Sequence, residues 1–197
     1  MANNAQQKQS SGGNIIKLAL VLLAVAAVIA LVLGFVNAIT MGPIAEYNLN
    51  KTNTAYANVL EADTYEEVDA AQYAAANGEN TITLLQEAKD ASGSVVGYVA
   101  ETEFSGAQGM ITMVIGLDAD KNCTGIYVTE HSETSGLGAK AAETSDGAWR
   151  DNLVGEADGL ALKKSGGNVE AISGATITST AVVNEVQTVI NAVKALG

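Results

Sequence analysis

The stretch Glu170-Ala-Ile-Ser-Gly-Ala-Thr-Ile-Thr-Ser-Thr180 leads from a short apolar step into a run of hydroxyl residues, and a regular apolar pattern follows it. That pattern has the spacing of one helix face, which predicts a helix with a buried apolar side. We expect this helix to begin between Ser173 and Thr178, with Ser173 as its N-cap. The residues of the expected buried face are Val182, Val186, Val189 and Val193, with Val183 and Ile190 beside them.

The start of this helix is also a candidate site for phosphate. The first backbone N–H groups of a helix have no partner within it, and the positive end of the helix dipole lies there. Hydroxyl residues also begin ordinary helices, where they need no ligand. Here, however, five hydroxyl residues accompany Gly174-Ala175 within the stretch, which is more than capping requires. The stretch therefore supports a functional interpretation beside the purely structural one.

Composition excludes several classes of function. The chain of 197 residues has a net charge of −12, and all 22 acidic residues follow position 45. Nucleic acid is not expected as a partner, because phosphate binding needs clustered cations. The only cysteine, Cys123, rules out an internal disulfide, and the only histidine, His131, rules out a histidine-rich metal site. The sequence also lacks a nucleophile elbow, a Walker loop and a dinucleotide fingerprint, so neither a catalytic residue nor a metal site is expected.

A long apolar run near the N-terminus predicts a membrane-spanning helix. Leu18 to Val36 contains no charged or strongly polar residue, and at the rise of a helix it reaches about 28 Å, close to the hydrocarbon thickness of a bilayer. A cleaved signal peptide is the alternative, because Val36-Asn37-Ala38 resembles a cleavage site, but signal-peptide cores are usually shorter. Lys8 and Lys17 against Lys51 give a slight positive-inside bias. We therefore expect the lipid bilayer as a partner, a cytoplasmic N-terminus and a domain on the extracytoplasmic side.

The rest of the chain is typical of an α+β domain. Short apolar runs separated by turns predict an antiparallel meander, which the C-terminal helix completes. Tyr65-Glu-Glu-Val68 and Ala139 to Trp149 are expected to be helical. The expected strands are 81–88, 95–104, 110–117 and 123–130, with Ile82 and Leu84 on one side of the first. The expected parts of the chain are a flexible tail (1–14), a transmembrane helix (15–41), a membrane-proximal helical segment (42–80) and the folded domain (81–197).

Two glycine-bearing stretches together resemble the signatures of a known family. Glu170-x-x-Ser-Gly-Ala-Thr176 closely resembles the flavinylation motif of the FMN-binding domain family, in which a flavin transferase esterifies FMN through its phosphate to the last threonine. The upstream stretch His131-Ser-Glu-Thr-Ser-Gly-Leu-Gly138 resembles a second signature. That signature occurs in the G subunits of Rnf complexes and, without the histidine, in the C subunits of Na⁺-translocating NADH:quinone reductases. The order of tail, span and domain is similar too, so the resemblance covers nearly the whole chain.

The resemblance implies that FMN is covalently attached to Thr176 by a phosphoester. It implies a flavin-carrying electron-transfer subunit of a membrane-bound complex that passes electrons between ferredoxin and NAD⁺ and moves Na⁺ or H⁺. The implied partners are the other membrane subunits of that complex and a flavin transferase. Leu137 would cover the face of the isoalloxazine ring, and the glycines beside it would let the backbone approach the ring edge. The other residues implied in the cofactor site are Ser173, Gly174, Ala175 and Thr178, and upstream His131, Glu133, Thr134, Gly136, Leu137 and Gly138.

Two residues depart from the family pattern. Glu170 stands where the family usually has Asp, which keeps the charge but lengthens the side chain by one methylene. Ser135 stands where the second signature usually has Pro, which removes a fixed φ angle from the loop. Neither change removes the acceptor hydroxyl. The alternatives are the corresponding subunit of a Na⁺-translocating NADH:quinone reductase, a non-redox anchored domain that binds a partner through its acidic surface, and a stand-alone extracellular reductase.

Overall fold

The computed structural model describes residues 6–78, 80–157 and 159–197, and the chain divides into two compact units with the boundary after Asn50. Helix α1 (Gln6–Val59) begins in the first unit and ends in the second. Within it, Ile15–Thr40 has a mean hydropathy of 3.1 and exposed side chains, and it is long and apolar enough to cross a membrane. This segment lies in the region where the sequence predicts a span, and it supports a membrane-anchored protein.

The segments on either side of the span differ in part from the prediction. Of the predicted flexible tail, residues 6–14 belong to α1, because extending an existing helix costs much less than starting a new one. Residues 1–5 lie outside the described residues. After the span, the helical prediction for Tyr65-Glu-Glu-Val68 is wrong, since strand β1 (Thr64–Glu67) lies there. Pairing with the next strand outweighs local helix preference at this position.

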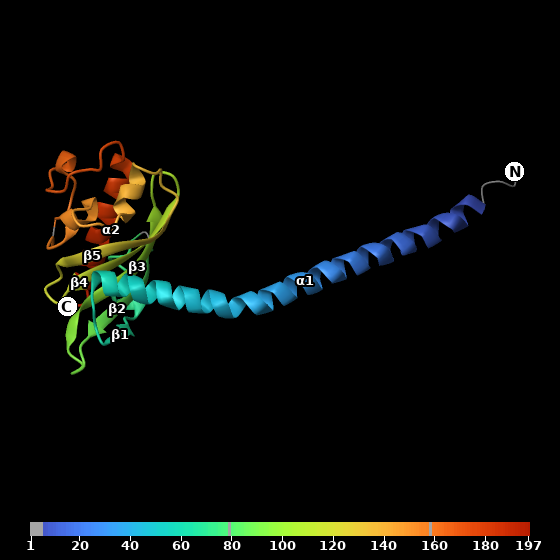
Figure 1. The fold of residues 1–197 in the computed structure, drawn as a ribbon, viewed down its shortest axis with the longest axis horizontal. Coiled ribbons are helices and arrows are strands. Elements are labelled where there is room, and N and C mark those ends of the chain that lie inside the picture. Colours follow the sequence, from blue (N-terminus) through green and yellow to red (C-terminus); the bar gives the residue numbers. More distant parts are fainter. Residues whose placement is uncertain (1–5, 79, 158) are drawn as a thin grey trace. The chain divides into compact units, whose positions relative to one another are not determined.

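Five antiparallel strands form one sheet in their order along the chain (Figure 1). The predicted meander is therefore confirmed, with β1 as an added edge strand. A bulge between Ile82 and Leu84 shifts the register of the second strand, so Leu85 rather than Leu84 joins Ile82 in the core, contrary to the prediction. The strands after β1 are β2 (Ile82–Lys89), β3 (Val95–Ser105), β4 (Met110–Asp118) and β5 (Cys123–His131).

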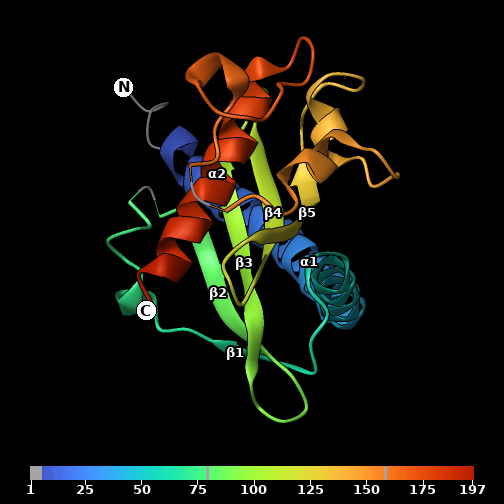
Figure 2. The ribbon, with the colours of Figure 1, turned by 90° about the vertical axis from the view of Figure 1, so that its left-hand side faces the viewer.

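Helix α2 (Thr176–Lys194) covers one face of the sheet (Figure 2). The predicted valine stripe is confirmed, because all four of its valines are fully buried. They share the main core with Leu85 of β2 and with Met113 and Ile115 of β4. Burying an apolar side chain of this size contributes about 1.5–3 kcal/mol. The packing of this stripe therefore holds the first turn of α2, which follows the glycine-bearing stretch, at a defined place on the sheet.

The opposite face of the sheet holds the last turns of α1, which belong to the second unit. Val99 and Val114 point away from the main core, because successive strand residues alternate between the faces, and they pack with Tyr56 and Val59. The helix comes very close to the strands here. A Cβ added at Gly116 would lie 2.7 Å from the carbonyl oxygen of Val59. Only glycine therefore allows this approach.

Short 3₁₀ helices interrupt the chain between β5 and α2. The predicted helix over 139–149 is only partly correct, since η2 (Gly138–Ala142) and η3 (Trp149–Leu153) are separated by Gly147 at φ +76°. The indole N–H of Trp149 donates to the Glu170 carbonyl at 2.6 Å, which fixes the entry to the stretch before α2. The other 3₁₀ helices are η1 (Ala70–Gln72), between β1 and β2, and η4 (Lys163–Ser165).

Candidate functional site

A tight turn leads into the first residue of α2. The N–H of Ala175 donates to the Ile172 carbonyl at 2.9 Å, and Gly174 has a φ of +76°. A β-turn with positive φ at its third residue needs glycine there. The prediction of Ser173 as the N-cap is wrong, because Ser173 is a central residue of this turn. Ala175 is the N-cap, and its side chain makes no capping bond.

The side chain of Ser179 takes over the role of a cap from inside the helix. Its Oγ accepts the N–H of Ile172 at 2.9 Å and donates to the Ala175 carbonyl at 2.9 Å. Ser179 is fully buried, so these two bonds are shielded from water. This role was not predicted from the sequence, where Ser179 counts only as one of several hydroxyl residues. The turn is therefore held at both of its ends by one hydroxyl group.

The predicted acceptor, Thr176, is the first residue of α2 and is partly exposed. Ser173 and Gly174 before it are exposed, and Ile177 after it is 68% exposed. The first backbone hydrogen bond of α2 runs from the N–H of Ser179 to the Ala175 carbonyl at 3.0 Å. The N–H groups of the three preceding residues therefore have no acceptor within the helix. The start of α2 is therefore accessible to another protein at Ser173, Gly174 and Ile177.

Glu133 joins this helix to two loops. It lies after β5 and is 9% exposed. One carboxylate oxygen accepts the N–H groups of Ala107 and Gln108, in the loop between β3 and β4, at 2.8 and 2.9 Å. The other oxygen accepts the hydroxyl of Thr178, which is also buried, at 2.5 Å. The N–H of Glu133 donates to Nδ1 of the exposed His131 at 3.2 Å.

Close contacts explain two of the glycines around Glu133. A Cβ added at Gly138 would overlap the Glu133 carboxylate and lie 2.7 Å from the Thr178 hydroxyl. A Cβ added at Gly106 would also overlap the carboxylate. Gly138 is therefore needed for the approach of Glu133, a sufficient reason for this glycine apart from any contact with a ligand. Gly136, by contrast, has a φ of +74° and open space around it.

A small cavity of about 70 Å³ lies where the two glycine-bearing stretches meet. The structure thus brings together two segments about 40 residues apart in the sequence. Ala107 and Gln108 were not predicted, although Gly106 and Gly109 in their hairpin signalled a tight loop. The predicted residues His131, Ser173, Gly136 and Thr176 do not line this cavity. Its lining consists of Ala107, Gln108, Glu133, Thr134, Leu137, Gly138, Gly174, Ala175 and Thr178.

Comparison with known proteins identifies the family. The FMN-binding domain family matches residues 106–191, which include both stretches. The chain is 33% identical over 186 residues to the G subunit of the Na⁺-translocating ferredoxin:NAD⁺ oxidoreductase complex of Acetobacterium woodii, covering 87% of this chain and 88% of that protein. This chain belongs to the family of G subunits of ion-translocating oxidoreductase complexes. The G-subunit family is the one that the two stretches resemble.

Other G subunits are similar over shorter spans. The G subunit of the ion-translocating oxidoreductase complex of Methanosarcina acetivorans is 43% identical over 118 residues, which cover 59% of this chain and 61% of that protein. The corresponding protein of Escherichia coli K12 is 31% identical over 164 residues, covering 77% and 78%. The chain therefore spans less than two thirds of the archaeal relative but more than three quarters of these two bacterial ones.

The charge state of Glu133 follows from its surroundings in this G subunit. Burial raises the pKa of the carboxyl, but the hydrogen bonds from Thr178, Gln108 and Ala107, together with the nearby His131, outweigh burial and lower the pKa below its usual value. Glu133 is therefore a carboxylate at neutral pH. The negative charge lies close to the first turn of α2, where the helix dipole favours it.

The start of α2 fits an FMN phosphate. Gly174 and Ala175 are small, the hydroxyl groups of Ser173 and Thr176 are beside them, and the unbonded N–H groups of the first turn supply donors. Lys163, paired with Glu170 at 3.1 Å, is a cation that the structure links to this stretch. Within the described residues, no cluster of three or more His, Cys, Asp or Glu is placed to hold a metal ion.

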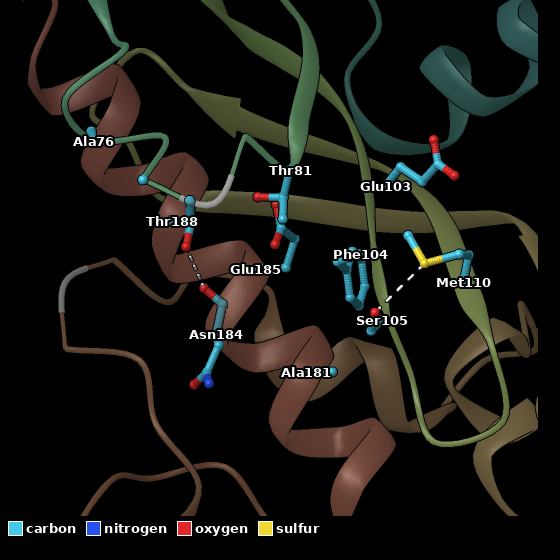
Figure 3. A pocket seen from close by; sticks show the side chains of 11 residues that line it. Ala76, Thr81, Glu103, Phe104, Ser105, Met110, Ala181, Asn184, Glu185 and Thr188 are labelled. Carbon is cyan, nitrogen blue, oxygen red and sulfur yellow. Dashed lines mark hydrogen bonds between the residues drawn. The ribbon is translucent and has the colours of Figure 1, made fainter.

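A second, larger cavity of about 580 Å³ lies along the following turns of α2 (Figure 3). The α2 residues that line it recur at helical spacing, so they share one helix face. Figure 3 shows Phe104 and Ser105 of β3 lying between this helix face and Met110 of β4. The cavity was not predicted from the sequence. Its lining consists of Ala76, Gly78, Thr81, Glu103, Phe104, Ser105, Met110, Ala181, Asn184, Glu185 and Thr188.

Proposed function

We propose that this G subunit carries FMN attached through a phosphoester to Thr176, and that the flavin relays electrons within a membrane-bound ferredoxin:NAD⁺ oxidoreductase that translocates ions. The observation that carries the proposal is the partly exposed threonine that begins α2, directly after a glycine turn of small residues. The name of the relative from Acetobacterium woodii supports the choice of ferredoxin and NAD⁺ as redox partners of the complex. The bound flavin would supply the electron-transfer chemistry.

The attachment reaction needs an activated flavin. With a flavin dinucleotide as donor, the Thr176 oxygen forms a bond to the phosphorus of the FMN half, the phosphoanhydride bond breaks, and AMP leaves. The hydroxyl proton passes to a base of the transferase or to water. No redox change occurs in this step. The partners of the G subunit are then a flavin transferase during maturation and the other membrane subunits in the working complex.

The residues of this chain have separate tasks in that reaction. Gly174 and Ala175 leave space for the transferase beside the acceptor, because neither carries a long side chain. The N–H groups of the first helical turn and the hydroxyl of Ser173 would hold the phosphate, because the start of a helix favours negative charge. Leu137, which is 41% exposed, offers an apolar surface close to Gly174 for the flavin ring. Thr134 and Gly136 lie in the loop after β5, and His131 is the last residue of that strand. None of the three has a separate task in the attachment step.

The expected orientation follows from the charges beside the span. Lys8 and Lys17 before it, against Lys51 after it, favour a cytoplasmic N-terminus in the bilayer and a flavin domain on the extracytoplasmic side. A covalent bond would keep the flavin on its carrier in a compartment where free FMN is scarce. The orientation is tested by replacing residue 8 or residue 51 with cysteine and treating whole cells with a membrane-impermeant thiol reagent. We expect labelling at position 51, and labelling at position 8 would contradict the proposed orientation.

The attachment site is tested by mass spectrometry of the full chain produced together with a flavin transferase. The peptide that contains Thr176 should carry the mass of FMN less water. Thr176→Val should remove flavin fluorescence from the denatured band, and Thr176→Ser should keep it. Thr188→Val, which removes a hydroxyl farther along α2, is the matched control and should remain flavinylated. Fluorescence that persists in Thr176→Val would contradict the proposal.

A further inference from the structure

Both carboxylate oxygens of Glu133 are already engaged by protein donors. Three hydrogen bonds, from Ala107, Gln108 and Thr178, reach the two oxygens from two other segments. Bonds to a carboxylate are stronger than those between neutral groups. A carboxylate accepts about four hydrogen bonds, so a flavin group that bound to Glu133 through more than one bond would displace a protein donor and leave it unpaired, which is costly. The main partners of the Glu133 carboxylate are therefore groups of the protein itself.

We infer that Glu133 is a positioning residue: it acts through Thr178 to hold the first turn of α2 against the loop between β3 and β4, and it thereby sets the orientation of the acceptor Thr176. The inference rests on the proposed attachment at Thr176. Thr178 lies two residues after the acceptor in the same helical turn. A shift of Thr178 therefore moves the backbone that carries the acceptor oxygen.

The packing around the carboxylate supports this role. Gly106 and Gly138 surround it from two sides, and a Cβ at either position would overlap it. The two glycines therefore let the carboxylate lie in direct contact with Thr178 and with the loop at Ala107. Misplacing a reacting group by about 1 Å can cost on the order of a hundredfold in rate. A contact of this kind, next to the reacting residue, is well placed to control the rate of flavin transfer.

Glutamine at position 133 separates the hydrogen bonds from the charge. Its carbonyl oxygen can accept the N–H groups of Ala107 and Gln108, and its amide can donate to the Thr178 hydroxyl, so the geometry is preserved while the charge is lost. Alanine removes both. Thr178→Val removes only the bond to α2. Glu143→Gln, at an exposed position outside the site, removes the same charge and serves as the control.

The experiment measures transfer of FMN from FAD to the full unmodified chain in detergent, with purified transferase, at a temperature where every variant is folded. Glu133→Ala and Thr178→Val should lower kcat on the order of tenfold or more and leave KM for the G subunit within about twofold, because the surface that the transferase meets is unchanged. Glu133→Gln should retain most of the wild-type kcat, and Glu143→Gln all of it. Amide hydrogen exchange at Ala107 and Gln108 should speed up in Glu133→Ala and not in Glu133→Gln.

Several outcomes would overturn the inference. One is a wild-type kcat in Thr178→Val and Glu133→Ala together with faster exchange at Ala107, which would leave Glu133 a purely structural role in the loop. Another is a raised KM at constant kcat, which would place Glu133 in the surface that binds the transferase. Should Glu133→Ala not fold, Thr178→Val and Glu133→Gln carry the test. Wild-type protein that is not modified at Thr176 would instead refute the proposed function, while hydrogen exchange would still report on Glu133.

Discussion

The hydroxyl of Ser179 accepts the N–H of Ile172 at 2.9 Å, and this bond ties the start of α2 back to the residue that begins the preceding turn. The same oxygen donates to the Ala175 carbonyl. Thr176, the proposed acceptor of FMN, lies within the loop that these bonds close. The position of the acceptor is therefore determined from inside the protein, while the residues beside it remain exposed to solvent.

We expect Ser179→Ala to lower the free energy of unfolding by about 1–3 kcal/mol, because the Ile172 N–H is buried and would lose its acceptor. Urea unfolding of the full chain in detergent, followed by the fluorescence of Trp149, the only tryptophan, measures the change. Thr188→Val is the control, since the Thr188 hydroxyl bonds to the Asn184 carbonyl one turn before it in its own helix. A control that is as destabilised as Ser179→Ala would show that any α2 hydroxyl matters equally.

Gly174→Ala should destabilise the protein for two reasons. The residue has a φ of +76°, where a side chain is strained, and a Cβ there would lie 3.0 Å from Cδ2 of Leu137. Gly93→Ala, at φ +81° with open space around it, measures the strain alone, which is about 1 kcal/mol or more. Gly174→Ala should cost more than Gly93→Ala, and adding Leu137→Ala should remove the excess. Equal melting temperatures for the two single variants would show that the contact is unimportant.

The contribution of Glu133 to stability should depend on pH. Its pKa is lowered in the folded protein, so it binds a proton less readily there than in the unfolded chain, where the value is about 4.3. The stabilisation is therefore fully present above about pH 4.3, and it is lost as the pH falls further, through the pKa of the folded state. The stability difference between wild type and Glu133→Gln, corrected with Glu143→Gln, should shrink over that range. A difference that does not change between pH 6 and pH 3 would contradict the assignment.

The only cysteine should be unreactive in the native protein. Burial raises the pKa of the Cys123 thiol to about 12, and the side chain is 1% exposed. At pH 8 only about one thiol in ten thousand is then ionised, and the thiolate is the reactive form. Iodoacetamide should leave the folded chain unmodified and label it after unfolding in urea. Rapid labelling of the native protein would show that β5 opens at this end.

The sequence predicted the elements whose patterns are local. The valine stripe of α2 and the alternation within β3 to β5 reflect burial along a single element, and the turns between those strands carry glycine or aspartate. Tyr65 was placed in a helix because pairing with β2 depends on residues about 20 positions later. The shift at Leu84 was missed for the same reason, since a bulge is defined only by the partner strand.

The sequence predicted which residues form the candidate site better than it predicted what each residue does there. The resemblance of two stretches named most of the residues that line the small cavity. It did not reveal that Glu133 bonds to Thr178 and needs Gly138 beside it, because a contact across 45 residues leaves no spacing pattern. It also missed Ala107, whose contribution is its backbone N–H, a group that every residue but proline possesses. Ser173 was predicted to cap α2, whereas the buried hydroxyl of Ser179 makes the hydrogen bonds that hold the start of the helix.

The close approach of α1 to the sheet has a consequence for reading natural variation in this family. Gly116 faces the backbone of Val59, and Gly97 faces the side chain of Leu60 and the carbonyl of Leu117. Substitutions at these positions would be selected against although they lie on the face of the sheet away from α2. An invariant glycine in an alignment of G subunits can therefore reflect the packing of α1 on the sheet and not only flavin binding. The face of the sheet on which a position lies shows whether contact with α1 explains its glycine.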